Sequence, residues 1–273
     1  KDGLNAGGDL LLAHCPERVL PGNVIHELGA NDRIIGGVSA QSSAKAAELY
    51  RTFVTGNLLI TDSNTAEFTK LAENTYRDLN IALANELAQL AEAMNVDVTE
   101  VIELANRHPR VNILNPGPGV GGHCIPIDPW FLVSKAQNIS TLIPAARQVN
   151  DTQPEFVAKR VLNTLDDIAA PRVAILGVAY KGNVSDTRET PATVVIDILE
   201  KANVEIRVHD PYVRTFIKPL VTIQEALAGV DIALLLTDHS DYLDLDPNLI
   251  GAKMRSRRIF DTRNVIDKKR WIS

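Results

Sequence analysis

The longest regular pattern of hydrophobic and polar positions runs from Thr65 to Met94. Its mainly apolar positions recur every three or four residues, which is the spacing of one face of an α-helix; they are Phe68, Leu71, Ala72, Thr75, Leu79, Ala82, Leu83, Leu87, Leu90 and Met94. Asn64, with Glu67 three residues later, resembles a capping arrangement at a helix start. The pattern predicts a helix of about 30 residues, ~45 Å long.

Shorter patterns predict the other elements. Further helices are expected at residues 44–54, 97–106, 143–165 and 223–228 and from residue 191 onward. Asp97 and Thr190 can cap two of these helices, and Pro191 suits a first helical position. Apolar runs predict short strands at Leu10–Ala13, Arg33–Val38, Val173–Leu176, Glu205–His209, Ile232–Leu236 and Arg258–Phe260.

The order of these elements indicates the fold class. From about residue 170 onward strands alternate with helices, which is typical of a parallel sheet covered by helices on both faces. The chain is long enough to bury a sizeable core and to hold more than one domain. We therefore predict an α/β protein in which a Rossmann-like C-terminal sheet follows a helical region built on the long helix.

The amino-acid composition limits the kinds of binding partner that are expected. The 273 residues carry a net charge of −6, with 45% hydrophobic and 23% charged residues, which is ordinary for a globular protein. This balance gives no basic footprint for nucleic acid or an anionic membrane, and no apolar run approaches the ~20 residues that span a bilayer. Cys15 and Cys124 make no disulfide framework and suit a reducing compartment, so we expect a cytoplasmic protein.

Residues 115–130 hold the densest group of special residues, Asn-Pro-Gly-Pro-Gly-Val-Gly-Gly-His-Cys-Ile-Pro-Ile-Asp-Pro-Trp. Gly121 and Gly122 permit backbone conformations closed to other residues and a close approach by a ligand, and the prolines that follow stiffen the segment. A thiolate is a good attacking group once positive charge or N–H groups lower the thiol pKa. Cys124 on this loop, with Asp128 four residues later, therefore suits a positioned nucleophile better than a packing cysteine.

The loop resembles that of the UDP-glucose/GDP-mannose dehydrogenase family, the nucleotide-sugar 6-dehydrogenases, which reads Gly-Gly-x-Cys-x-x-x-Asp. With the flanking segments 107–113 and 128–131, it is most similar to the branch that oxidises UDP-N-acetyl-D-mannosamine. The UDP-glucose branch usually has a lysine just before the loop's aspartate, where this chain has Ile127. The resemblance implies a UDP-N-acetylhexosamine as substrate, NAD as cofactor and an oxidoreductase as function.

The resemblance also implies a reaction course. The sugar C6 alcohol is oxidised by NAD to an aldehyde, Cys124 captures the aldehyde as a thiohemiacetal, a second NAD takes another hydride to give a thioester, and water releases the acid. Lys70 and Asn74 match the family's Lys-x-x-x-Asn helix, and their spacing places both on one helix face where they can aim donors at an oxyanion. Asp128 would orient Lys70 or a water. Glu17 matches the acid that handles the hydrolytic water. Without the resemblance, all four are also consistent with solvated or turn-forming positions.

Other residues are assigned to binding by the same resemblance. The implied substrate contacts are Gly121, Gly122, His123, Arg110 and Lys181. Lys181 would contact the nucleotide, since it follows a strand at the end of the sheet where ligands bind. Arg110 would reach the sugar from the other subunit of a dimer, and Arg188 would reach NAD across a cleft.

The resemblance divides the chain into three parts. Residues 1–55 are expected to be the end of an N-terminal dinucleotide-binding domain, 56–168 a central helical dimerisation and catalytic domain, and 169–273 a C-terminal UDP-binding domain. No strand followed by Gly-x-Gly-x-x-Gly is found near the start, so we expect about the first third of the family's pattern to be absent. The broad apolar stripe of the long helix predicts a homodimer.

The sequence can be compared with four alternatives to this function. His14-Cys15 and His123-Cys124 could supply zinc ligands, but adjacent residues rarely bind one metal and the usual ligand spacing is not found, so no metal is predicted. A thiol hydrolase or acyl-transferase would need a histidine linked to Cys124, and the sequence offers no recognisable pattern for one. A non-catalytic nucleotide-sugar-binding module remains open, as does a UDP-glucose-type 6-dehydrogenase.

Overall fold

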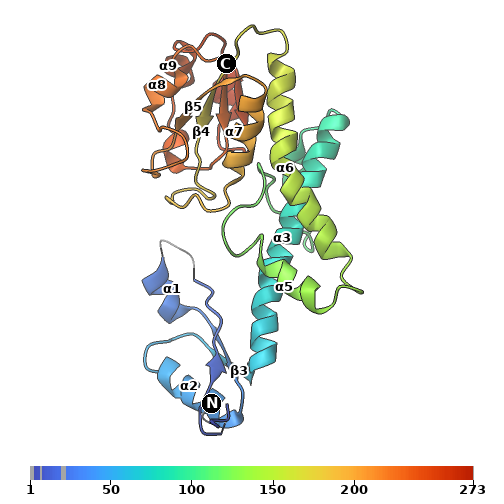
Figure 1. Cartoon of the computed structure of the whole chain (residues 1–273), viewed down its shortest axis with the longest axis vertical. Helices are drawn as coiled ribbons and strands as arrows, with labels where there is room; N and C mark the ends of the chain where they lie inside the picture. Colours follow the sequence, from blue (N-terminus) through green and yellow to red (C-terminus); the bar gives the residue numbers. More distant parts are fainter. Residues whose placement is uncertain (1–2, 7, 20–22, 273) are drawn as a thin grey trace. The chain divides into compact units, whose positions relative to one another are not determined.

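The computed structural model describes residues 3–6, 8–19 and 23–272. The chain divides into two compact units, residues 1–74 and 75–273, and Figure 1 shows their helices and strands. The division into three domains at residues 55 and 168 stays a prediction.

The first unit is built on a three-stranded sheet that contains one parallel and one antiparallel pair. Its strands, in the order of the sheet, are β1 (Ala13–His14), β2 (Arg33–Gly37) and β3 (Leu58–Asp62), and β2 pairs in parallel with β3. α1 (Val24–Ala30) precedes β2, and α2 (Ala40–Tyr50) connects the two parallel strands. β2 is buried throughout, whereas Leu59 and Ile60 of β3 are exposed.

Two predicted elements of this unit are displaced. The strand expected at Leu10–Ala13 is only Ala13–His14, because pairing with β2 is confined to Gly36 and Gly37. The helix expected at residues 44–54 begins at Ala40, because the Ser39 hydroxyl accepts a hydrogen bond from the N–H of Ser42 and caps it there.

The long helix predicted from apolar spacing is α3 (Ser63–Ala93), which has 31 residues. The predicted cap at Asn64 is wrong, since Asn64 lies inside the helix. The Asp62 carboxylate instead accepts hydrogen bonds from the N–H of Thr65 at 3.0 Å and from its hydroxyl at 2.6 Å. The last residue of β3 thus satisfies the open end of the helix that follows it.

The second unit begins with the later part of α3, which is followed by α4 (Val98–Ala105), α5 (Asp128–Lys135) and α6 (Leu142–Leu165). α3 and α6 lie side by side, as Figure 1 shows, and buried polar groups join them. Arg147 donates to Asp78 at 2.5 Å, and the Asn85 amide donates to Asn150 at 3.0 Å. Burial raises the pKa of Asp78, although Arg147 beside it acts in the opposite direction.

A four-stranded parallel sheet completes the second unit. Its order is β5 (Glu205–His209), β4 (Arg172–Leu176), β6 (Ile232–Leu235) and β7 (Ile259–Asp261). α7 (Pro191–Lys201) and the end of α6 cover one face. α8 (Ile223–Leu227) and α9 (Pro247–Gly251) cover the other, and α10 (Lys268–Ile272) follows β7. The predicted α/β class is confirmed.

The pattern of β4 follows from this layering. Val173 and Ile175 pack toward α6 and α7, while Ala174 and Leu176 pack toward α8 and α9, so every side chain from Val173 onward is buried. β4 lies between β5 and β6, and the chain leaves it toward β5 before it returns to β6. The loops after β4 and β6 therefore separate at the carboxyl edge of the sheet, which is where ligands bind in open α/β sheets.

Candidate functional site

The glycine loop that carries Cys124 docks on the loop after β4. A Cβ atom at Gly121 would lie 2.8 Å from Cβ of Tyr180 and 2.7 Å from the carbonyl oxygen of Glu189, so no larger residue fits. Gly122 has φ +88° beneath the Tyr180 ring, and its N–H donates to the carbonyl of Arg188 at 3.0 Å. The two glycines are needed for this close approach.

Cys124 lies one turn before α5 and is half-buried. Its carbonyl oxygen accepts hydrogen bonds from the N–H groups of Ile127 at 3.0 Å and Asp128 at 2.8 Å. Pro129, at the start of α5, is buried. The backbone that carries the thiol is therefore fixed on both sides, by the docked glycines before Cys124 and by the turn that leads into α5 after it.

Arg188 and His123 lie on the exposed side of this loop pair. The Arg188 guanidinium holds both carboxylate oxygens of Asp186, with distances from 2.6 to 3.1 Å. This hydrogen bonding lowers the pKa of Asp186. The structure thus brings Gly121, Gly122, His123 and Cys124 together with Arg188, and Lys181 lies half-buried in the same loop after β4.

Sequence reasoning missed a buried pair behind this loop, Asp210 and His239. Asp210 follows β5 and His239 follows β6, and Nε2 of His239 lies 3.1 Å from the Asp210 carboxylate. Both side chains are fully buried. A signal was available for Asp210, since an acidic residue directly after a strand points to the carboxyl edge of a parallel sheet.

Arg263 was also missed, although it follows β7 at the same edge. Its guanidinium donates to Asp238 at 2.9 Å, and its side chain occupies the space beside Gly117, where a Cβ would lie 2.5 Å from one guanidinium nitrogen. Arg263 therefore joins the carboxyl edge of the sheet to the segment that leads to Cys124.

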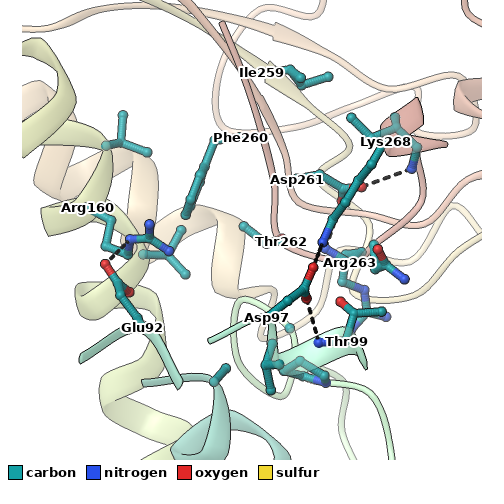
Figure 2. Close-up of a pocket in the computed structure, with 18 of the residues that line it drawn as sticks. Glu92, Asp97, Thr99, Arg160, Ile259, Phe260, Asp261, Thr262, Arg263 and Lys268 are labelled. Atoms are coloured by element: carbon teal, nitrogen blue, oxygen red, sulfur yellow. Dashed lines mark hydrogen bonds and ion pairs between the residues drawn. The ribbon is translucent and has the colours of Figure 1, made fainter. Parts of the chain in front are cut away.

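A groove of about 870 Å³ runs beside β7, between α6 and the start of α4, and reaches Gly117 and Arg263. Figure 2 shows two ion pairs that cross it. Lys268 bonds Asp97 at 2.6 Å, and Arg160, which lies 4.8 Å from the centre of the Phe260 ring, bonds Glu92 at 2.6 Å. The volume is that of a small-molecule site. The first ion pair joins the start of α4 to α10, and the second joins α3 to α6, from which Arg160 also reaches the Phe260 ring of β7.

Glu17, Lys70 and Asn74 belong to the first unit. One oxygen of Glu17, Oε1, accepts hydrogen bonds from the N–H groups of Arg18 and Val19 and from the buried Arg33 at 2.9 Å. Partial burial works to raise the pKa of Glu17, but these hydrogen bonds, led by that of Arg33, hold it below its ordinary value. Lys70 and Asn74 are half-buried one turn apart on α3. Their meeting with Cys124 stays a prediction.

Arg110 lies on an exposed turn between α4 and the glycine loop, where its N–H donates to Nδ1 of His108 at 3.4 Å. Its predicted contact with a partner's sugar is not tested by this chain alone. In the part of the chain that the structure describes, no three His, Cys, Asp or Glu side chains gather as metal ligands. None of the helices described is both long and apolar enough to cross a membrane.

Comparison with models of protein families shows to which family the chain belongs. Three models of the UDP-glucose/GDP-mannose dehydrogenase family match in chain order. The NAD binding domain matches residues 1–54, the central domain residues 64–152 and the UDP binding domain residues 174–268. The chain belongs to this family.

Relatives within the family include a UDP-N-acetyl-D-mannosamine dehydrogenase of Methanocaldococcus jannaschii, which is 51% identical over 96% of this chain and 62% of its own length. An NDP-N-acetyl-D-galactosaminuronic acid dehydrogenase of Ralstonia nicotianae is 44% identical over 96% of this chain and 62% of its own. The solved structure of a UDP-D-ManNAc dehydrogenase from Pyrococcus horikoshii superposes with a TM-score of 0.91 at 44% identity, over 97% of this chain and 64% of that one. The chain therefore spans just over three fifths of the length of these relatives.

Proposed function

We propose that this chain provides the thiol and the nucleotide-sugar site of an NAD-dependent dehydrogenase, which oxidises C6 of a UDP-N-acetylhexosamine to the acid. UDP-N-acetyl-D-mannosamine is the substrate we favour. The observation that carries the proposal is the half-buried Cys124, fixed beside the loop after β4 at the carboxyl edge of the UDP-binding sheet. The identity of 51% to the Methanocaldococcus enzyme supports the choice of sugar.

The proposed role of Cys124 is nucleophilic. Its sulfur adds to the C6 aldehyde, and the thiol proton passes to the former carbonyl oxygen, which gives a thiohemiacetal. Loss of the remaining hydride from C6 and of the proton from its hydroxyl group gives a thioester. Attack by water then breaks the C–S bond, and the thiol and a carboxylate are released. NAD, when bound, would supply the hydride acceptor for both oxidation steps.

The first unit offers a place that fits part of NAD. A hollow of about 510 Å³ lies at the carboxyl ends of the parallel strands β2 and β3, lined by Gly37, Ser39 and Thr61 among others. A Cβ at Gly37 would lie 2.4 Å from the backbone nitrogen of Ser43, so the strand end approaches α2 closely. Dinucleotides bind at such edges of open α/β sheets, and these residues would hold a portion of the cofactor.

The remaining polar residues would act around the thiol. Lys70 and Asn74, one turn apart on α3, would donate hydrogen bonds to the C6 oxygen as negative charge develops there. Asp128, at the start of α5, would orient Lys70 or a water. The anchored carboxylate of Glu17 suits a group that must hold the hydrolytic water in one position.

Cationic side chains at the sheet edge would hold the nucleotide. Lys181 lies in the loop after β4, and Arg263, labelled in Figure 2, lies after β7 beside the groove. Both are within the part of the chain that matches the UDP binding domain. Arg188 would reach NAD. The similarity of 44% to the Ralstonia enzyme keeps an N-acetylgalactosamine derivative as a second candidate sugar.

We also propose a homodimer with shared active sites. Leu83 and Leu90 lie two turns apart on α3 and are 49% and 51% exposed, while Met94 just beyond it is 73% exposed. Exposed apolar stripes of this kind mark protein interfaces. In such a dimer Arg110 would reach the sugar in the partner's site.

The test is the stoichiometry of NADH formation. The full-length protein should convert UDP-N-acetyl-D-mannosamine with two NADH per sugar, measured by absorbance, and with much lower kcat/KM for UDP-glucose. One NADH per sugar would contradict the proposed thioester step. Binding of the nucleotide sugar without any NADH formation would favour the non-catalytic module instead.

A further inference from the structure

The backbone N–H groups of the loop after β4 are mostly occupied within the protein. Four of the six N–H groups from Val178 to Asn183 donate to protein acceptors. Val178 and Ala179 donate to Asp210, Tyr180 to the carbonyl of Asp186 and Asn183 to His239. In dinucleotide-binding Rossmann domains, the first such loop uses its N–H groups to bind pyrophosphate.

Asp210 is the centre of this arrangement. Its Oδ2 accepts from Val178 at 2.7 Å and Ala179 at 3.1 Å, and its Oδ1 accepts from the N–H groups of Tyr212 and Val213 at 2.9 Å each. A buried carboxylate with this many donors is a satisfied anion. It lies where a bound phosphate would receive the first two loop N–H groups.

His239 fixes the orientation of that carboxylate. Its Nδ1 accepts from the N–H of Asn183 at 2.9 Å, so the ring proton of the neutral imidazole is on Nε2, which faces Asp210 at 3.1 Å. The ring stacks on Tyr212 with a centroid distance of 4.8 Å and meets Tyr242 edge-on at 5.6 Å. Neither the Asp210 carboxylate nor the His239 ring can rotate without losing several of these contacts.

The loop is held on its other side by Thr237. Gly177 has φ +88°, and a Cβ there would lie 2.4 Å from Cβ of Thr237. The Thr237 hydroxyl donates to the carbonyl of Ala179 at 2.7 Å. The start of α7 is likewise satisfied internally, because Pro191 has no N–H and the Thr190 hydroxyl accepts from Ala192.

We propose that Asp210 is a built-in anion that fills the N–H cradle after β4, so that this domain rejects a dinucleotide pyrophosphate and leaves nucleotide phosphates to the side chains of Lys181 and Arg263. The second half of this inference rests on the proposed UDP function, whereas the first half does not. In a protein that also uses NAD, a carboxylate at this position keeps the cofactor out of the C-terminal domain, whose topology is nearly that of a dinucleotide-binding domain.

The test compares amide signals and affinities in the 273-residue chain. In the wild type, inorganic pyrophosphate should leave the NMR signals of the Val178 and Ala179 amides in place. In Asp210→Ala the vacated cradle should bind pyrophosphate and shift both signals. Wild-type signals that move with pyrophosphate, or a folded Asp210→Ala protein whose signals do not respond, would overturn the inference.

Two isosteric variants, each with aspartate replaced by asparagine, provide a test that does not depend on whether Asp210→Ala folds. Asp210→Asn should weaken UDP binding, measured by calorimetry, by about tenfold or more, since hydrogen bonds to a charged acceptor that shape the loop are lost. Asp231→Asn is the matched control. Asp231 is also buried and accepts from the N–H of Arg172 at 2.8 Å, but it lies at the opposite edge of the same sheet. Its UDP affinity should stay within about twofold of the wild type.

The outcomes of these experiments distinguish a failure of the role proposed for Asp210 from a failure of the proposed UDP function. Equal UDP affinity in Asp210→Asn and the wild type would overturn the positioning role of Asp210. Lys181→Ala should weaken UDP binding without moving the Val178 and Ala179 amides, and a shift of those amides would contradict side-chain binding of the phosphates. A wild-type chain that rejects pyrophosphate and also fails to bind UDP would count against the proposed function while the anion-plug role stands.

Discussion

Cys124 owes its position to backbone contacts rather than to its own side chain. The carbonyl of Cys124 accepts from Ile127 and Asp128, and the N–H of Gly122 is held by Arg188. Replacing sulfur with oxygen should therefore leave the loop in place. We expect Cys124→Ser in the full-length protein to abolish net oxidation to the acid, measured as NADH formation, while UDP affinity by calorimetry stays within about twofold of the wild type.

A serine variant of the other cysteine, Cys15, is the control for this experiment. Cys15 is half-buried in the first unit, and burial raises the pKa of its thiol, although a hydrogen bond with Tyr50 acts in the opposite direction. Cys15→Ser should retain most of the activity. Acid formation at the wild-type rate by Cys124→Ser would refute the nucleophile assignment.

Asp210 also predicts a pH dependence of stability. Burial works to raise its pKa, but hydrogen bonds from His239 and from backbone N–H groups outweigh it, so the pKa lies well below the ordinary 3.8. A lowered folded-state pKa contributes stability that is fully present above the unfolded-state pKa and is lost as the pH falls through the folded-state value.

We expect the difference in free energy of unfolding between the wild type and Asp210→Asn to be constant above about pH 5 and to shrink as the pH falls below the unfolded-state value of about 4. Urea denaturation at a series of pH values measures it. A difference that stays constant down to about pH 2 would show that the charge of Asp210 contributes nothing to folding.

At the scale of elements, the contact between α3 and α6 includes a buried ion pair. Arg147 and Asp78 are 2% and 0% exposed, and Arg147 also bonds Asp151 on its own helix. Removing the guanidinium would leave the Asp78 carboxylate buried without its counter-charge. We expect Arg147→Ala to lower the free energy of unfolding by about 3–5 kcal/mol, measured by chemical denaturation.

Lys159 on the same helix is the matched control. Its ion pair with Glu155 is exposed, and Lys159→Ala should cost no more than about 1 kcal/mol. Equal losses for Arg147→Ala and Lys159→Ala would mean that burial of the first pair has no energetic consequence.

At the scale of the whole molecule, the proposed dimer makes a prediction about shared sites. Arg110 is exposed on its own chain, and the proposal places it in the partner's site. Full-length Arg110→Ala and Cys124→Ser proteins should each be inactive alone. After mixing and subunit exchange they should regain activity, because a heterodimer contains one site with both residues intact.

The rescue is measured as NADH formation after exchange, with exchange itself followed by mass spectrometry of tagged subunits. Two portions of the same Arg110→Ala protein, mixed in the same way, are the control and should stay inactive. Demonstrated exchange without rescue would mean that Arg110 acts within its own subunit or has no role in the reaction.

Much of the secondary structure could be predicted because it depends on nearby residues. The apolar spacing of α3, the Thr190-Pro191 start of α7 and the Asp97 cap of α4 are properties of a few adjacent positions. The apolar run of β4 predicted a strand buried on both faces. β3 escaped prediction because Leu59 and Ile60 are exposed and its pattern does not alternate.

The residues of the candidate site likewise include some that the sequence predicts and others that only the tertiary structure reveals. The sequence by itself determined the glycine loop, Cys124 and the lysine after β4, because their residue types occur in a local, recognisable order. Only the tertiary structure decided the roles of Asp210 and His239, which meet across 29 residues, and of Arg147 and Asp78, which meet across 69. A buried charge is defined by its partners, and those partners are set by the return of the chain through the sheet and the helix pair, which no local pattern encodes.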